Sequence, residues 1–263
     1  MYKKMVSDLV LLFICCFFVT IGNYQLLKQT TYKNIPDNIL WSAEFRAQKL
    51  DEDTCRQLQS KTNVGEYIGN YLLEKNWGNK LWIKNNHWKN YQKYMKAIWD
   101  DVDFFPIPAF SNQSQMKVSY VDTWMAERTY GGVRGHEGTD IMAQKNERGL
   151  YPIVSMTDGT VTNKGWLEKG GYRIGITAPG GAYFYYAHLD SYSHINIGDQ
   201  VKAGDLLGFM GDSGYGIEGT VGQFAVHLHL GIYLYLDGKE VSVNPYWILR
   251  YIENKRVKCY TSL

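Results

Sequence analysis

The strongest constraint on the fold is a change in sequence pattern at about Lys117. From there to the C-terminus, short runs of β-branched and aromatic residues alternate with turns that contain glycine. These runs are VSYVDTW, YPIVSM, GTVTN, YRIGITA, AYFYYAHL, QVKAGDLLGFMG, HLHLGIYLYL and VSVNPYWIL. Several short strands at such close spacing are typical of a β-sandwich or barrel. Residues 111–263 are therefore predicted to form a mainly β domain.

The preceding region has a different pattern. Residues 36–103 contain few glycines, and apolar side chains recur at helical spacing, as at Val64, Ile68 and Leu72. We expect three or four amphipathic helices here, with the role of a spacer. The segment FFPIPAF at 104–110 contains two prolines, which end helices, so we expect a linker there. The predicted units are 1–29, 30–110 and 111–263.

The first unit is an apolar N-terminal segment. No charged residue occurs from Leu9 to Leu27, and Lys3 and Lys4 precede this run. As a helix it would be about 28 Å long, close to the thickness of a bilayer core. The alternative is a cleaved signal peptide, but no small-x-small cleavage site follows the run. We expect an uncleaved single-pass membrane anchor, with the rest of the chain outside the cell; a secreted protein is the alternative.

Charge and composition exclude one class of partner. The chain has 28 Lys and Arg against 26 Asp and Glu, a net charge of +2, whereas nucleic-acid-binding proteins usually concentrate basic residues. No nucleic-acid partner is predicted. Hydrophobic residues make up 45% of the chain, which is enough for a core. Aromatic residues reach 15% and indicate a core together with a groove that grips an extended ligand.

The four cysteines do not suggest a metal site, because no C-x-x-C spacing is present. Cys15 and Cys16 lie in the apolar run, where they are expected only to pack. Cys55 and Cys259 follow it, so they either form one disulfide or stay as two free thiols.

The chemistry of the chain is concentrated in its histidines, five of which lie between 136 and 229. His227 and His229 form an H-x-H pair, and residues i and i+2 of a strand point to the same face. Two imidazoles side by side on an apolar strand suit a metal ion. The alternative is one core and one surface histidine.

A second motif strengthens the metal interpretation. His136 and Asp140 are four residues apart, and imidazole nitrogen with carboxylate oxygen suits zinc. Catalytic zinc sites keep three protein ligands and one open position, so one histidine of the H-x-H pair would complete the set. The other, together with His188, is then available for proton transfer. His194 is expected at the surface, and Glu137 is expected to point away from the metal.

The order H-x3-D, Y-x-H-L and H-L-H resembles the lysostaphin/LytM family of zinc peptidases, which cut peptidoglycan peptides. The similarity covers much of 130–246 and includes GHEGTDI, YYAHL and GDQVKAGDLLG. It implies an antiparallel β-sandwich of the duplicated hybrid motif type, with Zn²⁺ at the floor of a groove. It implies a metalloendopeptidase that hydrolyses peptidoglycan cross-links or stem peptides. The implied zinc ligands are His136, Asp140 and His229, and the implied catalytic residues are His188 and His227.

Two departures and two alternatives accompany this resemblance. Residues 213–226 are longer than the short loop of small residues that the family commonly has before H-L-H, and we expect them to form a groove wall or lid. The helices at 36–103 match no wall-binding module. An inactive zinc-binding scaffold of the cell envelope is the alternative function, although such relatives usually lack one of the five site residues. The run VKAGDLLGFMG resembles lipoyl carrier modules, but its turn at 211–214 has no lysine.

Overall fold

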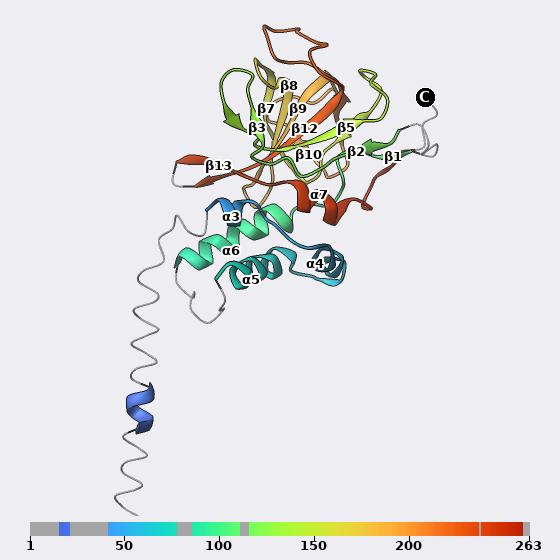
Figure 1. Cartoon of the computed structure of the whole chain (residues 1–263). Coiled ribbons are helices and arrows are strands. Elements are labelled where there is room, and N and C mark those ends of the chain that lie inside the picture. Colours follow the sequence, from blue (N-terminus) through green and yellow to red (C-terminus); the bar gives the residue numbers. More distant parts are fainter. Residues whose placement is uncertain (1–15, 22–41, 78–85, 111–115, 237, 260–263) are drawn as a thin grey trace, which may run out of the picture.

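The computed structural model describes residues 16–21, 42–77, 86–110, 116–236 and 238–259, and Figure 1 shows their arrangement. Within these ranges, no helix has the length and apolar character that crossing a bilayer requires. The expected anchor at 9–27 lies largely outside the described residues. The mainly antiparallel β domain and the helices before it are as predicted, while the two-layer sandwich stays a prediction.

The helical part lies beneath the strands in Figure 1. Its elements are α3 (Ala43–Arg46), α4 (Glu52–Gln57), the 3-10 turn η1 (Leu58–Ser60), α5 (Val64–Trp77) and α6 (Asn86–Trp99). The predicted apolar positions Ile68 and Leu72 are buried, as are Met95 and Ile98 on α6. Helices α5 and α6 approach closely at Gly65, where a Cβ atom would lie 2.6 Å from the Met95 carbonyl oxygen. Cys55, at the start of this region, is a free buried thiol.

The strands follow the predicted runs, with one correction. They are β1 (Ala109–Phe110), β2 (Val118–Ser119), β3 (Glu127–Arg128), β4 (Arg134–Gly135), β5 (Thr139–Ala143), β6 (Pro152–Val154), β7 (Gly159–Leu167), β8 (Gly171–Thr177), β9 (Tyr183–Tyr192), β10 (Gln200–Val201), β11 (Leu206–Met210), β12 (His227–Leu236), β13 (Lys239–Val243) and β14 (Lys258–Cys259). The closing run VSVNPYWIL was expected to be a strand, but only its first part belongs to β13. Its second part begins α7 (Tyr246–Ile252), because Pro245 suits the start of a helix and ends the ladder.

Ten of these strands form one hydrogen-bonded sheet. The main path runs β10-β7-β8-β9-β12-β5-β2, while β11 pairs with β9 and β6, and β13 pairs with β12. One face packs on the core through alternate residues such as Phe184, Tyr186, Leu228 and Leu230, which are all fully buried. The opposite face, which carries the intervening residues of β9 and β12, is free to form a site.

The segment expected to be a linker is packed into the molecule. Phe105 and Ile107 are fully buried, and β1 pairs in parallel with β14. The buried side chains of the helices and the sheet form one continuous cluster. A second contact joins α6 to the turn after β8, where Asp101 Oδ2 accepts a hydrogen bond of 2.7 Å from the Gly180 N–H. The helices therefore pack directly on the β domain.

Candidate metal centre and groove

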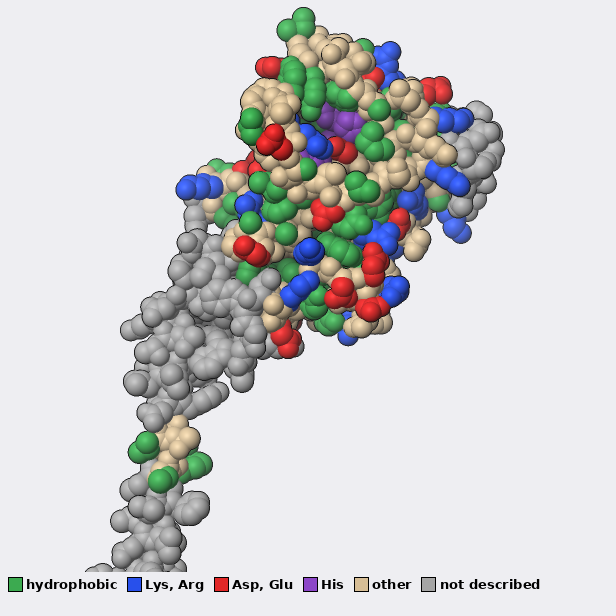
Figure 2. Space-filling view, in the orientation of Figure 1, with side chains coloured by type: hydrophobic (Ala, Val, Ile, Leu, Met, Phe, Trp, Pro, Cys, Tyr) green, Lys and Arg blue, Asp and Glu red, His purple; other side chains and the backbone are tan. Residues whose placement is uncertain are grey.

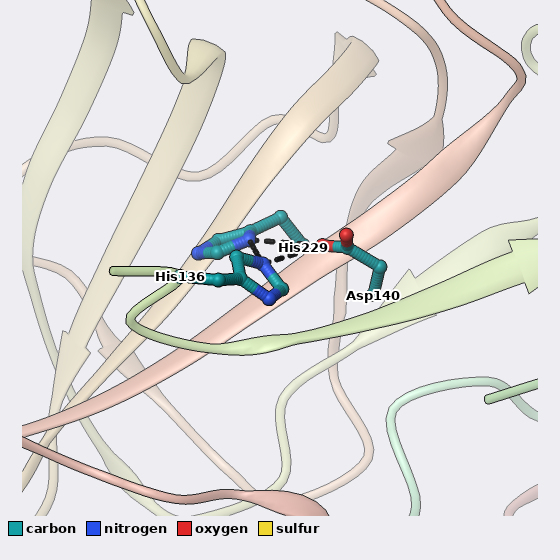
Figure 3. A group of neighbouring side chains, drawn as sticks. All are labelled: His136, Asp140 and His229. Atoms are coloured by element: carbon teal, nitrogen blue, oxygen red, sulfur yellow. Dashed lines mark hydrogen bonds and ion pairs between the residues drawn. The ribbon is translucent and has the colours of Figure 1, made fainter. Parts of the chain in front are cut away.

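Three of the predicted site residues meet where β12 pairs with β5 (Figure 3). Asp140 on β5 and His229 on β12 are directly opposite one another in the antiparallel register. His136 precedes β5, and its backbone pairs with the β3 side of the β3–β4 hairpin through the Ala126 carbonyl and the Met125 N–H. The three side chains point toward a common centre and form the group that is able to hold a metal ion.

The donor atoms of this group form a nearly equilateral triangle. His136 Nε2 lies 3.0 Å from Asp140 Oδ1 and 3.0 Å from His229 Nδ1, and the third edge, from His229 Nδ1 to Asp140 Oδ1, is also 3.0 Å. Ligands 2.0–2.1 Å from a tetrahedral zinc ion would lie about 3.3 Å from each other. Two imidazole nitrogens and one carboxylate oxygen are suitable zinc donors, so these residues fit the ion.

Backbone carbonyls fix the tautomers of three histidines. His136 Nδ1 lies 3.1 Å from the Thr123 carbonyl oxygen, His188 Nδ1 2.7 Å from that of Ser213, and His227 Nδ1 2.7 Å from that of Ala225. Because a carbonyl only accepts, each Nδ1 carries the proton and each Nε2 presents a lone pair. Such contacts orient metal ligands and proton-transfer groups alike.

The charges of the triad suit a cation. Burial raises the pKa of the Asp140 carboxyl, but its contacts with the ring nitrogens of His136 and His229 outweigh burial and hold that pKa well below the usual range. Burial lowers the pKa of His229, with contacts to Asp140 opposing the shift. The carboxylate is therefore ionised at neutral pH, and the His229 imidazole is kept neutral, as a metal ligand must be.

The other two predicted residues lie beside the triad. His227 Nε2 is 3.7 Å from Asp140 Oδ1, and the rings of His227 and His188 are 4.8 Å apart. Both side chains are buried, and burial together with the neighbouring His227 and His229 lowers the pKa of His188 well below its ordinary value. A neutral imidazole of this kind accepts protons. The structure thus brings all five predicted residues together.

His188 reaches the site through an irregularity in β9. Tyr183 and Tyr185 face the groove, so strict alternation would direct residue 188 into the core. The β8–β9 register shifts between Tyr172 and Ile174, and the register with β11 shifts nearby. His188 itself has a left-handed φ of 62°. This bulge turns the imidazole to the groove face, which is a common use of bulges next to active sites.

The five residues lie in a groove of about 710 Å³. Figure 2 shows histidine side chains in this hollow, with basic and acidic groups close by. Residues 213–226, predicted to form a wall or lid, do border it: Phe224 packs on His188 with ring centroids 4.6 Å apart. Tyr215 stacks on Tyr130 of the opposite hairpin at 4.1 Å, with the rings nearly parallel.

Three features of the groove were not predicted. Arg128 pairs with Asp140, three tyrosines (183, 185 and 233) form the floor beyond the histidines, and Tyr130 meets Tyr215 across the rim. The high tyrosine content was the one available signal. The two expectations for neighbouring residues agree with the structure: His194 is exposed, and Glu137 Oε1 accepts a hydrogen bond from Ser242 rather than facing the triad.

Comparison with known proteins shows that these residues lie in a region that matches a known family. Residues 134–245 match the model of peptidase family M23. A crystal structure assigned to glycyl-glycine endopeptidase LytM of Ruminococcus gnavus ATCC 29149 is 54% identical, with a TM-score of 0.79. The match covers 85% of this chain and 96% of that one.

Two curated relatives are similar over the β domain. The L-Ala–D-Glu endopeptidase of Bacillus subtilis (strain 168) is 43% identical over 147 residues, which are 56% of this chain and 42% of that protein. Glycyl-glycine endopeptidase ALE-1 of Staphylococcus capitis is 30% identical over 125 residues, 44% of this chain and 31% of that protein. The chain thus spans less than half the length of either relative.

Proposed function

The chain belongs to peptidase family M23, and from this premise we propose that it is a zinc-dependent endopeptidase that hydrolyses peptide bonds of peptidoglycan. The observation that supports this most directly is the triad of donor atoms with 3.0 Å edges beside two histidines of fixed tautomer. The three similar proteins described above are all named endopeptidases, which supports peptide-bond hydrolysis as the reaction.

In this proposal His136, Asp140 and His229 hold the zinc ion. When bound, zinc lowers the pKa of water and polarises a carbonyl group. The protein would supply three fixed ligands, so water or substrate could bind the ion as well. Burial of His136 under the β3–β4 hairpin excludes bulk water from one side of the triad.

His188 and His227 are proposed as the catalytic pair. Their Nδ1–H groups are held by carbonyls, so each Nε2 is available on the groove side. The lowered pKa of His188 keeps its imidazole neutral and able to take a proton from the attacking water. After protonation, either imidazole is able to stabilise negative charge on the tetrahedral carbon's oxygen or to return the proton to the leaving amine.

The first experiment combines metal analysis with digestion of purified peptidoglycan by the full chain. We expect one zinc ion per chain and release of peptide fragments, with loss of activity in a chelator and recovery on adding zinc. His229→Ala should lose the metal, whereas His188→Asn should keep it and lose turnover. His194→Ala, in an exposed turn, is the matched control.

The outcomes separate the alternatives. A folded protein that binds no zinc would overturn the proposal. Zinc binding without cleavage would favour the inactive scaffold. If His188→Asn remained fully active, the role given to His188 would be wrong.

We also propose that residues 9–27 anchor the protein in the cell membrane, with the groove on the outer side; secretion is the alternative. The apolar run between Leu9 and Leu27 supports this placement. Membrane fractions washed with alkaline carbonate should retain the protein, and a protease added to intact protoplasts should remove the β domain. Recovery of a shortened chain from the medium would instead indicate secretion.

A further inference from the structure

The groove beyond the histidines has charges of opposite sign on its two sides. Lys169, in the β7–β8 turn, and Arg173 on β8 line one side. Glu137 and Glu240 line the other side. Glu240 lies on β13, and Glu137 accepts a hydrogen bond from Ser242 of the same strand. Two strands, β9 and β12, separate β8 from β13. At about 4.8 Å per strand, the two sides are roughly 14 Å apart, enough for an extended peptide between them.

Arg173 is one of the groove-lining cations that this arrangement leaves available to a ligand. Among the described residues, neither Arg173 nor Lys169 forms an ion pair with an acidic side chain, whereas Arg128 is taken up by Asp140. The Nη1 of Arg173 is buried without a hydrogen-bond partner, and its cross-strand neighbour on β7 is Gly165, which has no side chain. A buried guanidinium nitrogen without a partner is costly unless a ligand supplies an acceptor.

The surroundings of Arg173 are suited to a carboxylate. The hydroxyl of Tyr185 lies against Gly170 and the ring of Tyr183 against Gly175, so both phenols approach the backbone beside Arg173 closely. Burial raises the pKa of Tyr183, and the nearby positive charge of Arg173 lowers it again without cancelling the shift. Both hydroxyls stay protonated at neutral pH and are donors. A carboxylate here would meet a guanidinium, which binds it with two parallel hydrogen bonds.

The position of Arg173 relative to the triad sets where that carboxylate lies. In the β8–β9 register, Arg173 lies opposite the bulge of β9 next to Ala187. Ala187 is in turn the cross-strand partner of His229. Arg173 is therefore two strand spacings, roughly 10 Å, from the backbone of His229. An extended peptide advances about 3.3 Å per residue, and an acidic side chain adds its own reach. The carboxylate then belongs to a residue one or two positions from the bond that is cut.

We propose that Arg173 anchors a carboxylate of the substrate, so that the enzyme acts on an acidic stem peptide, such as one with an L-Ala–D-Glu bond, and not on a glycine bridge. A glutamate within a peptide chain keeps one free carboxylate, whereas an oligoglycine has none. This inference rests on the proposed function, since it concerns the substrate of the same site.

The test uses the zinc-loaded full chain and three peptides. One contains L-Ala–D-Glu with its free carboxylate, the second is the same peptide with that carboxylate amidated, and the third is pentaglycine. For the unchanged protein we expect amidation to lower kcat/KM by about 10- to 100-fold, mainly through KM, and pentaglycine to be cut least. Arg173→Gln should lose this discrimination and Arg173→Lys should keep part of it, with zinc content unchanged in both.

Lys164→Gln is the matched control, because it removes one positive charge from the same hairpin at a residue whose amine donates to the Ile195 carbonyl outside the groove. It should discriminate like the unchanged protein. Equal rates on the acidic and amidated peptides, preference for pentaglycine, or unchanged discrimination in Arg173→Gln would overturn the inference. If no peptide is cut, the proposed function fails, and calorimetric binding of the acidic and amidated peptides still decides the role of Arg173.

Discussion

Arg128 Nη2 and Asp140 Oδ2 form an ion pair of 2.9 Å, on the carboxylate oxygen that does not face the histidines. The other oxygen, Oδ1, is 3.0 Å from both His136 and His229. Each oxygen of Asp140 therefore has its own partners. Because Arg128 lies on the β3–β4 hairpin, the wall of the groove also fixes the orientation of the proposed ligand.

This ion pair gives the first prediction. Arg128→Gln should weaken zinc binding by about 10- to 100-fold, as expected when the outer partner of a ligand is lost. Competition with a chromophoric chelator measures the affinity. Arg134→Gln is the control, since Arg134 is the cross-strand partner of Arg128, whereas the ion pair to Asp140 is formed by Arg128. Equal affinities in the two variants would show that Arg128 does not position the ligand.

A second prediction concerns Gly138, between His136 and Asp140. A Cβ atom there would lie 2.5 Å from the Leu230 carbonyl oxygen and 2.6–2.7 Å from the His229 ring. Moving the Leu230 backbone would cost more free energy than moving a side chain, so Gly138→Ala should displace the His229 imidazole. We expect weaker zinc binding and a loss of stability of about 1–3 kcal/mol. Metal titration and urea unfolding measure the two effects, and native values for both would show that the site relaxes.

The third prediction concerns the left-handed backbone of His188. Alanine at a φ of 62° is strained by about 1–2 kcal/mol, whereas glycine adopts this conformation freely and asparagine tolerates it. His188→Ala should therefore unfold at lower urea concentration than His188→Gly or His188→Asn, while all three lose turnover. The same order of stability in the absence of zinc would confirm that the backbone, not the metal, sets the difference. Equal stabilities would contradict a strained bulge.

The fourth prediction is the pH dependence of the contact between α6 and the β domain. Burial raises the pKa of Asp101, and the hydrogen bond from the Gly180 N–H only partly opposes this. The folded state thus holds the Asp101 proton more tightly than the unfolded state. This contribution is fully present below the unfolded pKa of about 3.9 and is lost as pH rises through the higher folded pKa.

Asp101→Asn keeps an acceptor for Gly180 but does not ionise. Its stability relative to the unchanged protein should therefore increase from pH 4 upward and then become constant, as urea unfolding across pH would show. Asp101→Ala does not ionise either but also removes the acceptor, so it should be about 1 kcal/mol less stable than Asp101→Asn at every pH. A difference between the asparagine variant and the unchanged protein that does not vary with pH would contradict the raised pKa.

The sequence by itself determined the elements and the chemical groups. Periodicity of two placed His227 and His229 on one face of a strand, and helical spacing predicted the burial of Ile68 and Leu72. These are local properties, because each follows from residues a few positions apart. The alternation rule is also local, and it fails at His188 because the bulge that turns this side chain depends on pairing with the distant strands β8 and β11.

Tertiary structure decided what depends on distant residues. Strand geometry left His227 and His229 equivalent, whereas pairing with β5 sets His229 opposite Asp140 and His227 opposite Met142. The ion pair of Arg128 needs the hairpin to fold over β5, and no spacing in the sequence encodes that contact. Likewise, the prolines at 104–110 indicate a break in the helix but not its burial, because burial is decided by the surfaces that pack on both sides.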